Sequence, residues 1–286
     1  MSELLYLIAQ VLYDQEPGQW MRPDQLYLAL SGRDEGDIDD ALHSMRGQGL
    51  IQSRWQNDLI RLSATGRDAW NDESIVEQTL GMQYVADKYG PATVHIIVTG
   101  ANGENAGSGF FSADYPGRII TASHVLRART ILRIENLEHE VIGRPPFEPP
   151  LLPPNGCDDP DLALIRCDCP DGINPVRIEW RRDVIRSLEP LLVLGYPAYP
   201  LLRPNLAHIK AELNQVGRNF TTERESLVLS SATLPGSSGG PVLSRRGRAI
   251  GVVEQENTSE RLGEGLSHSF TATPALYLTE LQEPER

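Results

Sequence analysis

Three residue types that together can cleave an acyl bond occur in this chain in the order histidine, aspartate, serine. His124 follows an apolar segment, Asp161 opens a second apolar segment, and Ser238 lies among glycines. An imidazole can act as a general base near neutral pH, a carboxylate can hold it in one tautomer, and a serine hydroxyl activated in this way is a nucleophile. The predicted chemistry is attack by Ser238 on a carbonyl, with His124 as the base and Asp161 as its orienting partner.

The segment around the serine, residues 234–241, contains three glycines beside Ser237 and Ser238. Because Gly236 has no Cβ, the chain can turn there and direct the N–H groups of Gly236 and Ser238 at one point, as an oxyanion hole requires. Taken alone, the segment is equally consistent with a flexible turn between two strands. The histidine and the aspartate upstream favour the catalytic interpretation.

Three segments of the chain resemble the signatures of trypsin-like serine proteases: residues 121–124 (Thr-Ala-Ser-His), 161–164 (Asp-Leu-Ala-Leu) and 236–241 (Gly-Ser-Ser-Gly-Gly-Pro). Their order is that of this family, and other serine hydrolase folds order them differently. The resemblance extends over about residues 92 to 276 and is closest to the bacterial HtrA-like branch, through glycine-marked strands at 107–111 and 194–197. It implies a double β-barrel and a serine endopeptidase that acts on protein or peptide substrates without a cofactor.

The resemblance also assigns three residues to the substrate cleft. Ala232 occupies the position, six residues before the nucleophile, where trypsin carries an acid, so a basic side chain would find no buried partner there. The strand that lines the cleft continues to Glu254 and Glu256, and relatives have a small hydroxyl residue at the place of Glu254. A carboxylate at Glu254 could disturb His124 or point outward. We expect small or medium apolar residues at the cleaved position and basic residues at a neighbouring subsite.

The first 73 residues have a different pattern, with helical apolar spacing in three segments, then two short strands and a helix near residues 64–70. This order resembles the winged-helix family, whose members usually bind DNA. Residues 1–75 carry six Lys and Arg against thirteen Asp and Glu, so a phosphate backbone would be repelled. We expect this domain to bind a protein or to sense a signal. A solvated acidic face without a partner is the alternative.

The expected fold is therefore multi-domain: an α+β winged-helix-like domain at residues 1–73, a helical connector at 74–91, and an all-β trypsin-like double β-barrel at 92–286. The connector is expected to be one amphipathic helix from Ser74 to Tyr89. Beyond it the apolar pattern changes from helical spacing to alternation in short strands with frequent turn signals. A closing helix is expected after Ala275.

Composition restricts the partners and the compartment. A formal charge of -13 argues against nonspecific binding to nucleic acid or anionic membranes. Cys157, Cys167 and Cys169 are odd in number and have no second ligand pair nearby, so neither a disulfide framework nor a metal site is expected. The first ten residues lack the basic segment of a signal peptide, and no apolar run is long enough to span a bilayer.

These features predict a cytoplasmic bacterial protease, restrained by its N-terminal domain or by a regulatory protein bound there. By analogy with other proteases that carry a sensing domain, a triggered system such as stress response or phage defence would suit it. An alternative from another class remains open: a winged-helix regulator or adaptor whose barrel holds peptides without cleaving them. The complete set of three catalytic residue types favours the protease.

Overall fold

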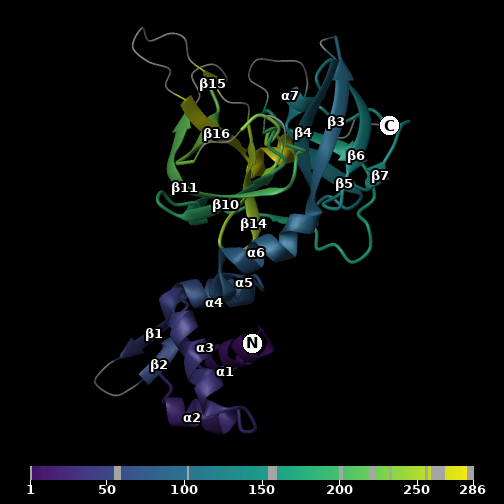
Figure 1. Cartoon of the computed structure of the whole chain (residues 1–286). Coiled ribbons are helices and arrows are strands. Elements are labelled where there is room, and N and C mark those ends of the chain that lie inside the picture. Colours follow the sequence, from purple (N-terminus) through teal and green to yellow (C-terminus); the bar gives the residue numbers. More distant parts are fainter. Residues whose placement is uncertain are drawn as a thin grey trace. The chain divides into compact units, whose positions relative to one another are not determined.

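The computed structural model describes residues 2–54, 59–101, 103–153, 160–199, 202–218, 223–231, 234–254, 257–258 and 268–281. The chain divides into two compact units (Figure 1). One comprises Met1–Val85 with Arg245–Gly247, and the other Ala86–Ser244 with Arg248–Arg286. Each unit has a hydrophobic core of its own, as separate domains do.

The first unit combines helices with a small two-stranded sheet. Its elements are α1 (Ser2–Tyr13), α2 (Pro23–Ala29), α3 (Glu35–Gly47), β1 (Ile51–Arg54), β2 (Leu59–Leu62), α4 (Ala64–Asn71) and α5 (Ile75–Leu80). Apolar residues three and four apart on α1 and α3 meet in one core, where Leu5, Ile8 and Met45 are fully buried. Asp34 is the N-cap of α3, and its carboxylate accepts the backbone N–H groups of Gly36 and Asp37. The winged-helix assignment stays a prediction.

The single helix predicted from Ser74 to Tyr89 is wrong. The segment forms α5 and a second helix, α6 (Met82–Tyr89), with Gly81 between them. Gly81 has φ 82 and ψ -172, a backbone conformation that side-chain-bearing residues rarely adopt, and it ends the helical hydrogen bonding of α5. Among the helices of the described ranges, none has the length and apolarity needed to cross a bilayer.

The second unit begins with a six-stranded antiparallel sheet of order β7-β6-β3-β4-β5-β8. Its elements are β3 (Thr93–Gly100), β4 (Gly103–Phe111), β5 (Arg118–Thr121), α7 (Ser123–Leu126), β6 (Thr130–Glu135), β7 (Val141–Gly143) and β8 (Ala163–Arg166). Both faces of these strands are covered: the register places Phe110 and Ile120 on the face opposite to Ile96, and all three side chains are fully buried. The helix α7 follows β5 directly and carries His124.

The second sheet has the order β15-β16-β12-β11-β10-β13-β14-β9, and β16 also pairs with β14, which closes six strands into a barrel. Its strands are β9 (Arg177–Ile178), β10 (Pro190–Gly195), β11 (Ala207–Arg218), β12 (Glu225–Leu229), β13 (Pro241–Leu243), β14 (Arg248–Val253), β15 (Asn257–Thr258) and β16 (His268–Pro274). Short 3₁₀ segments are η1 (Gly90–Ala92), η2 (Arg182–Val184) and η3 (Ala275–Glu280). A closing helix was expected after Ala275. Within the described residues, this part of the chain forms only the short 3₁₀ segment η3.

Candidate active site

His124 and Asp161 are in direct contact. Nδ1 of His124 lies 2.5 Å from Oδ2 of Asp161. The other carboxylate oxygen accepts the backbone N–H of His124 at 2.9 Å and the hydroxyl of Ser123 at 2.7 Å. The strands β5 and β8 pair antiparallel, so the residues that follow β5 and precede β8 lie at the same edge of the sheet. Three donors therefore fix the orientation of the Asp161 carboxylate and of the imidazole.

The charge of Asp161 depends on these donors. Burial by itself would raise the pKa of Asp161, but the hydrogen bonds and charge of His124, together with the Ser123 hydroxyl, outweigh burial and lower the pKa. An ionised carboxylate on Nδ1 keeps the other ring nitrogen free to accept a proton. This pair can therefore act as a general base.

Ser238 lies in the connection between β12 and β13, where backbone hydrogen bonds hold both flanks of its loop. The C=O of Ser238 accepts the N–H of Ser108 on β4 at 2.8 Å, and the N–H of Gly239 donates to Val253 on β14 at 2.9 Å. Gly239 has φ 88, and a Cβ there would lie 2.3 Å from Oγ1 of Thr121. Only glycine allows this loop to approach the strand that leads to His124 so closely.

The hydroxyl of Ser238 makes no hydrogen bond to any described residue, His124 included. Catalytic hydrogen bonds are often long or misaligned before substrate binds, so this geometry is compatible with a nucleophile. A hydroxyl without a partner is also free to approach a substrate carbonyl.

Gly236 turns the chain just before the nucleophile. It has φ 94, and a Cβ there would lie 2.5 Å from the C=O of Tyr196, so glycine is required. Within the described residues, the N–H groups of Gly236 and Ser238 donate to no acceptor. Two unpaired N–H groups separated by one residue on a glycine turn have the composition of an oxyanion hole.

Ser108 holds this turn in place, although its sequence pattern does not mark it as a functional residue. Its hydroxyl donates to the C=O of Gly236 at 2.7 Å and accepts the N–H of Tyr196 at 2.8 Å. Together with its backbone bond to Ser238, Ser108 ties both ends of the turn to β4. The available signal was a serine between two glycines on a predicted strand, but its partners lie more than eighty residues away in sequence.

Glu254 lies directly after β14 and is turned inward. Its Oε1 accepts the hydroxyl of Thr273 at 2.6 Å, while Oε2 has no hydrogen bond from any described residue. Burial raises the pKa of Glu254, and the nearby Asp161 adds to the rise, although hydroxyls and His124 act against it. The alternative in which Glu254 points outward is therefore wrong, because the side chain is enclosed between β14 and β16. Ala232 and Glu256 lie outside the described residues, and their assignment stays a prediction.

Among the described residues, no group of three His, Cys, Asp or Glu side chains could hold a metal ion. Cys167 and Cys169 are free thiols. Burial raises the pKa of both, which disfavours the thiolate forms that bind metals. Cys157 lies outside the described residues.

Comparisons with known proteins bear on this site as a whole. A family model described as a trypsin-like peptidase domain matches residues 107–252, about half of the chain. The structure resembles that of the HtrA-type protease AlgW with a tripeptide, with a TM-score of 0.52, 20% identity, and coverage of 69% of this chain and 61% of that one. It also resembles the serine endoprotease from Yersinia pestis, with a TM-score of 0.50 and 19% identity. This match covers 69% of this chain and 64% of that one.

A curated relative, the uncharacterized protein y4bJ of Sinorhizobium fredii, is 29% identical over 166 residues, which are 52% of this chain and 22% of that protein. This chain therefore spans less than two thirds of the length of the proteins it resembles. The likeness to the solved structures concerns the fold. It confirms the predicted fold class, a helical N-terminal region with a small sheet followed by an all-β barrel domain like that of HtrA-type proteases.

Proposed function

This chain belongs to the trypsin-like peptidase family, and we propose that it is a serine endopeptidase with Ser238 as nucleophile, His124 as general base and Asp161 as the orienting acid. The observation that carries the proposal is the His124–Asp161 contact at 2.5 Å beside a loop with a free serine hydroxyl. The family match supports peptide hydrolysis as the reaction class. The geometry supports these three residues as the machinery.

In this mechanism Ser238 Oγ attacks the carbonyl carbon of a peptide bond while His124 Nε2 takes the hydroxyl proton. The oxyanion that forms accepts hydrogen bonds from the N–H groups of Gly236 and Ser238. The ionised Asp161 stabilises the imidazolium, which then gives its proton to the departing amine as the C–N bond breaks. Water, activated by the same imidazole, hydrolyses the acyl-enzyme and restores Ser238.

The competing function is an adaptor whose barrel binds peptides without cleaving them. Such a protein has no need for an ionised carboxylate on a histidine or for free N–H groups at a serine. The pKa of Asp161 is lowered although only about a quarter of the side chain is exposed, which suits a residue that must face an imidazolium. This feature favours the peptidase.

We extend the proposal to residues 1–73 as a domain that binds a protein or senses a signal. Through the connector at 74–91, this domain would restrain the peptidase domain at 92–286. The acidic residues at the start of α3 oppose DNA binding. A hollow of about 620 Å³ between α2, α3 and β2, lined by Arg22, Tyr27 and Asp39 among others, could receive a polar partner. A cytoplasmic bacterial system with a trigger remains part of this proposal, and a gel shift with duplex DNA should show no salt-sensitive complex.

The function is tested by labelling the full chain with a fluorophosphonate, which reacts only with an activated serine. Ser238→Ala should abolish labelling and lower peptide turnover by about 10⁴-fold or more. Ser237→Ala is the matched control, because Ser237 is fully buried and its hydroxyl has no partner among the described residues. It should label like the wild type. Labelling that survives Ser238→Ala, or a wild type that neither labels nor cleaves, would contradict the proposed function.

A further inference from the structure

A cavity of about 520 Å³ opens beside the turn that carries Gly236. Its wall is formed by residues of β3, β4 and β6, by Ala198, Arg203 and Pro204, and by Pro235 and Gly236 themselves. All of these residues belong to the second unit. The cavity therefore adjoins one of the two N–H groups assigned above to the oxyanion.

The position of the cavity relative to the nucleophile follows from the hydrogen bonds on the two flanks of the loop. On one flank Gly239 bonds to Val253 of β14, and on the other the N–H of Ala198 donates to Pro235 at 2.7 Å. The cavity includes Ala198 and Pro235 and no residue of β14. A peptide substrate binds beside the nucleophile in an extended conformation, so the residues before and after the cleaved bond lie on opposite sides of Ser238. If β14 lines the side before the bond, the cavity lies on the side of the departing amine.

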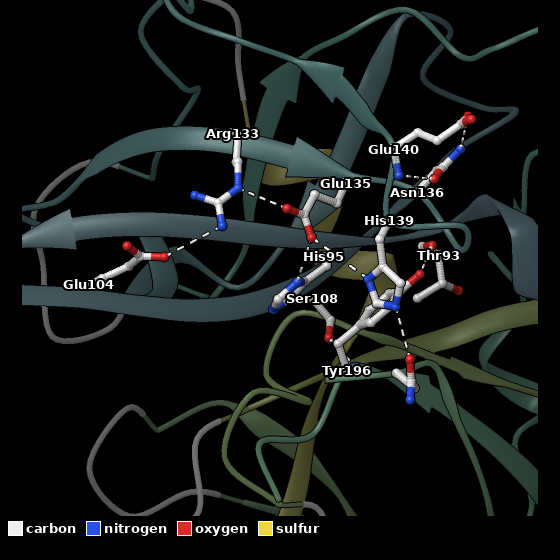
Figure 2. A network of polar contacts seen from close by, with 11 residues as sticks. Thr93, His95, Glu104, Ser108, Arg133, Glu135, Asn136, His139, Glu140 and Tyr196 are labelled. Carbon is white, nitrogen blue, oxygen red and sulfur yellow. Dashed lines mark hydrogen bonds and ion pairs between the residues drawn. The ribbon is translucent and has the colours of Figure 1, made fainter. Parts of the chain in front are cut away.

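The carboxylates within the cavity wall already have partners (Figure 2). Nε of Arg133 donates to Oε1 of Glu135 at 2.8 Å. The Nδ1 atoms of His95 and His139 lie 3.6 and 3.8 Å from the other oxygen of Glu135. Burial alone would raise the pKa of Glu135, but Arg133 and His95 outweigh burial and lower the pKa. Arg133 also lies 3.7 Å from Glu104, so a positive charge already faces both acids.

The groups that remain for a ligand are donors. Arg203 is exposed and makes no ion pair with a described residue. His95 is more than nine-tenths buried, and neither of its ring nitrogens forms a hydrogen bond within the described part of the chain. Burial lowers the pKa of His95, and its ring stacks on that of Tyr196 with the two centroids 5.1 Å apart. Among the described residues of the wall, the one charged side chain without an ion-pair partner is therefore Arg203.

We propose that this cavity is a subsite for an acidic side chain, Asp or Glu, among the first residues after the cleaved bond, with Arg203 as its ion-pair partner. The proposal rests on the proposed function of Ser238 and specifies the substrate class of that site. A carboxylate fits because it would form an ion pair with the guanidinium of Arg203, the only charged side chain in the described part of the wall that lacks such a partner. Since Arg203 is exposed, the preference should be modest and should weaken as salt increases.

The first test uses matched peptides that differ only in one residue after the cleaved bond, which is Glu, Gln or Lys. The full chain should cleave the Glu peptide with a kcat/KM about fivefold above the Gln peptide, and the Lys peptide least well. Arg203→Gln should remove the difference between the Glu and Gln peptides, and Arg203→Glu should favour Lys. Arg218→Gln, which removes an exposed arginine away from the cavity, should keep the wild-type order.

Equal cleavage of the three peptides by the wild type would overturn the subsite and leave the proposed function standing. A preference for Glu that persists in both Arg203 variants would also overturn it. Binding of the same peptides to Ser238→Ala by calorimetry separates the two proposals. Tighter binding of the Glu peptide that is lost with Arg203→Gln supports the subsite even if the wild type cleaves nothing, and equal binding of the Glu and Gln peptides rejects it.

Discussion

Asp161 and Glu254 are two largely enclosed carboxylates close to His124, and their pKa values are shifted in opposite directions. Asp161 accepts three hydrogen bonds, and its pKa is lowered. Glu254 accepts the Thr273 hydroxyl on one oxygen, and among the described residues the other oxygen accepts none, so burial raises its pKa. Burial is similar at the two sites. The number and charge of the donors therefore decide which carboxylate ionises easily.

The difference between the two sites comes from the segments that face each carboxylate. Asp161 faces the start of α7, which supplies a backbone N–H, a serine hydroxyl and an imidazole. Glu254 follows β14, and the neighbouring strand β16 supplies it with one hydrogen bond, from the hydroxyl of Thr273. Two adjacent anions would compete for the same imidazole. The protein avoids this conflict by making only one of the two acids easy to ionise.

The largest expected effect is that of Asp161→Asn. The amide keeps the shape of the side chain but presents a donor to Nδ1, so the imidazole is held in the wrong tautomer. We expect kcat to fall by about 10³- to 10⁴-fold, with the fluorophosphonate rate falling in parallel. Asp183→Asn, at an exposed aspartate, is the control and should retain activity. A loss of less than tenfold would mean that Asp161 does not orient His124.

A third enclosed carboxylate, Glu135, sharpens the comparison because it is stabilised by Arg133. Glu135→Gln should lower the free energy of unfolding of the second unit by about 1–3 kcal/mol at pH 7, since the guanidinium loses its charged partner. The pKa of Glu135 in the folded state is below the usual 4.5. The stabilisation by the ionised Glu135 is therefore present above pH 4.5 and is lost as the pH falls through the folded-state pKa.

Urea unfolding at about pH 7 and about pH 3.5 measures both parts of this prediction, and the difference from the wild type should shrink at the lower pH. Glu104→Gln is the matched control, because Glu104 faces the same Arg133 at 3.7 Å from a largely exposed position. It should change stability by less than about 0.5 kcal/mol. An equal loss for the two variants would show that burial of Glu135 is irrelevant.

The sequence was most informative where a short segment determines its own geometry. The turn at Gly236 and the close approach at Gly239 both require glycine, and the placement of both residues beside Ser238 already indicates a constrained loop. The order of the segments led to the correct family and fold class. The break at Gly81 was missed because apolar spacing continues across it, whereas the backbone angle that ends α5 leaves no trace in that spacing.

The sequence was least informative where a contact depends on strand register. His95 and Glu135 lie directly opposite each other because β3 pairs with β6 in one particular register. Arg203 reaches the same cavity from a segment between two other strands. The inward direction of Glu254 likewise depends on which residues β16 places beside it. Periodicity predicts that such strands exist, but it does not state which residues become neighbours.

The smallest expected effect distinguishes Glu254 from the other two acids. The pKa of Glu254 in the folded state is raised above the usual 4.5. Below pH 4.5 the carboxyl is protonated in both the folded and the unfolded state, so its burial costs no stability there. As the pH rises through the folded-state pKa, the chain loses stability. Glu254→Gln should therefore increase the free energy of unfolding by about 1 kcal/mol at about pH 8 and leave it unchanged at about pH 4.

The neutral amide can still accept the hydroxyl of Thr273, so the local packing should be preserved. Glu280→Gln, at a partly exposed acid paired with Arg224, is the control and should not stabilise the chain at high pH. If Glu254 were held as an anion in the manner of Asp161, its substitution would instead destabilise the chain at about pH 8. Unfolding curves at the two pH values therefore decide whether the donors around a buried carboxylate, rather than its burial, account for the contrast between these acids.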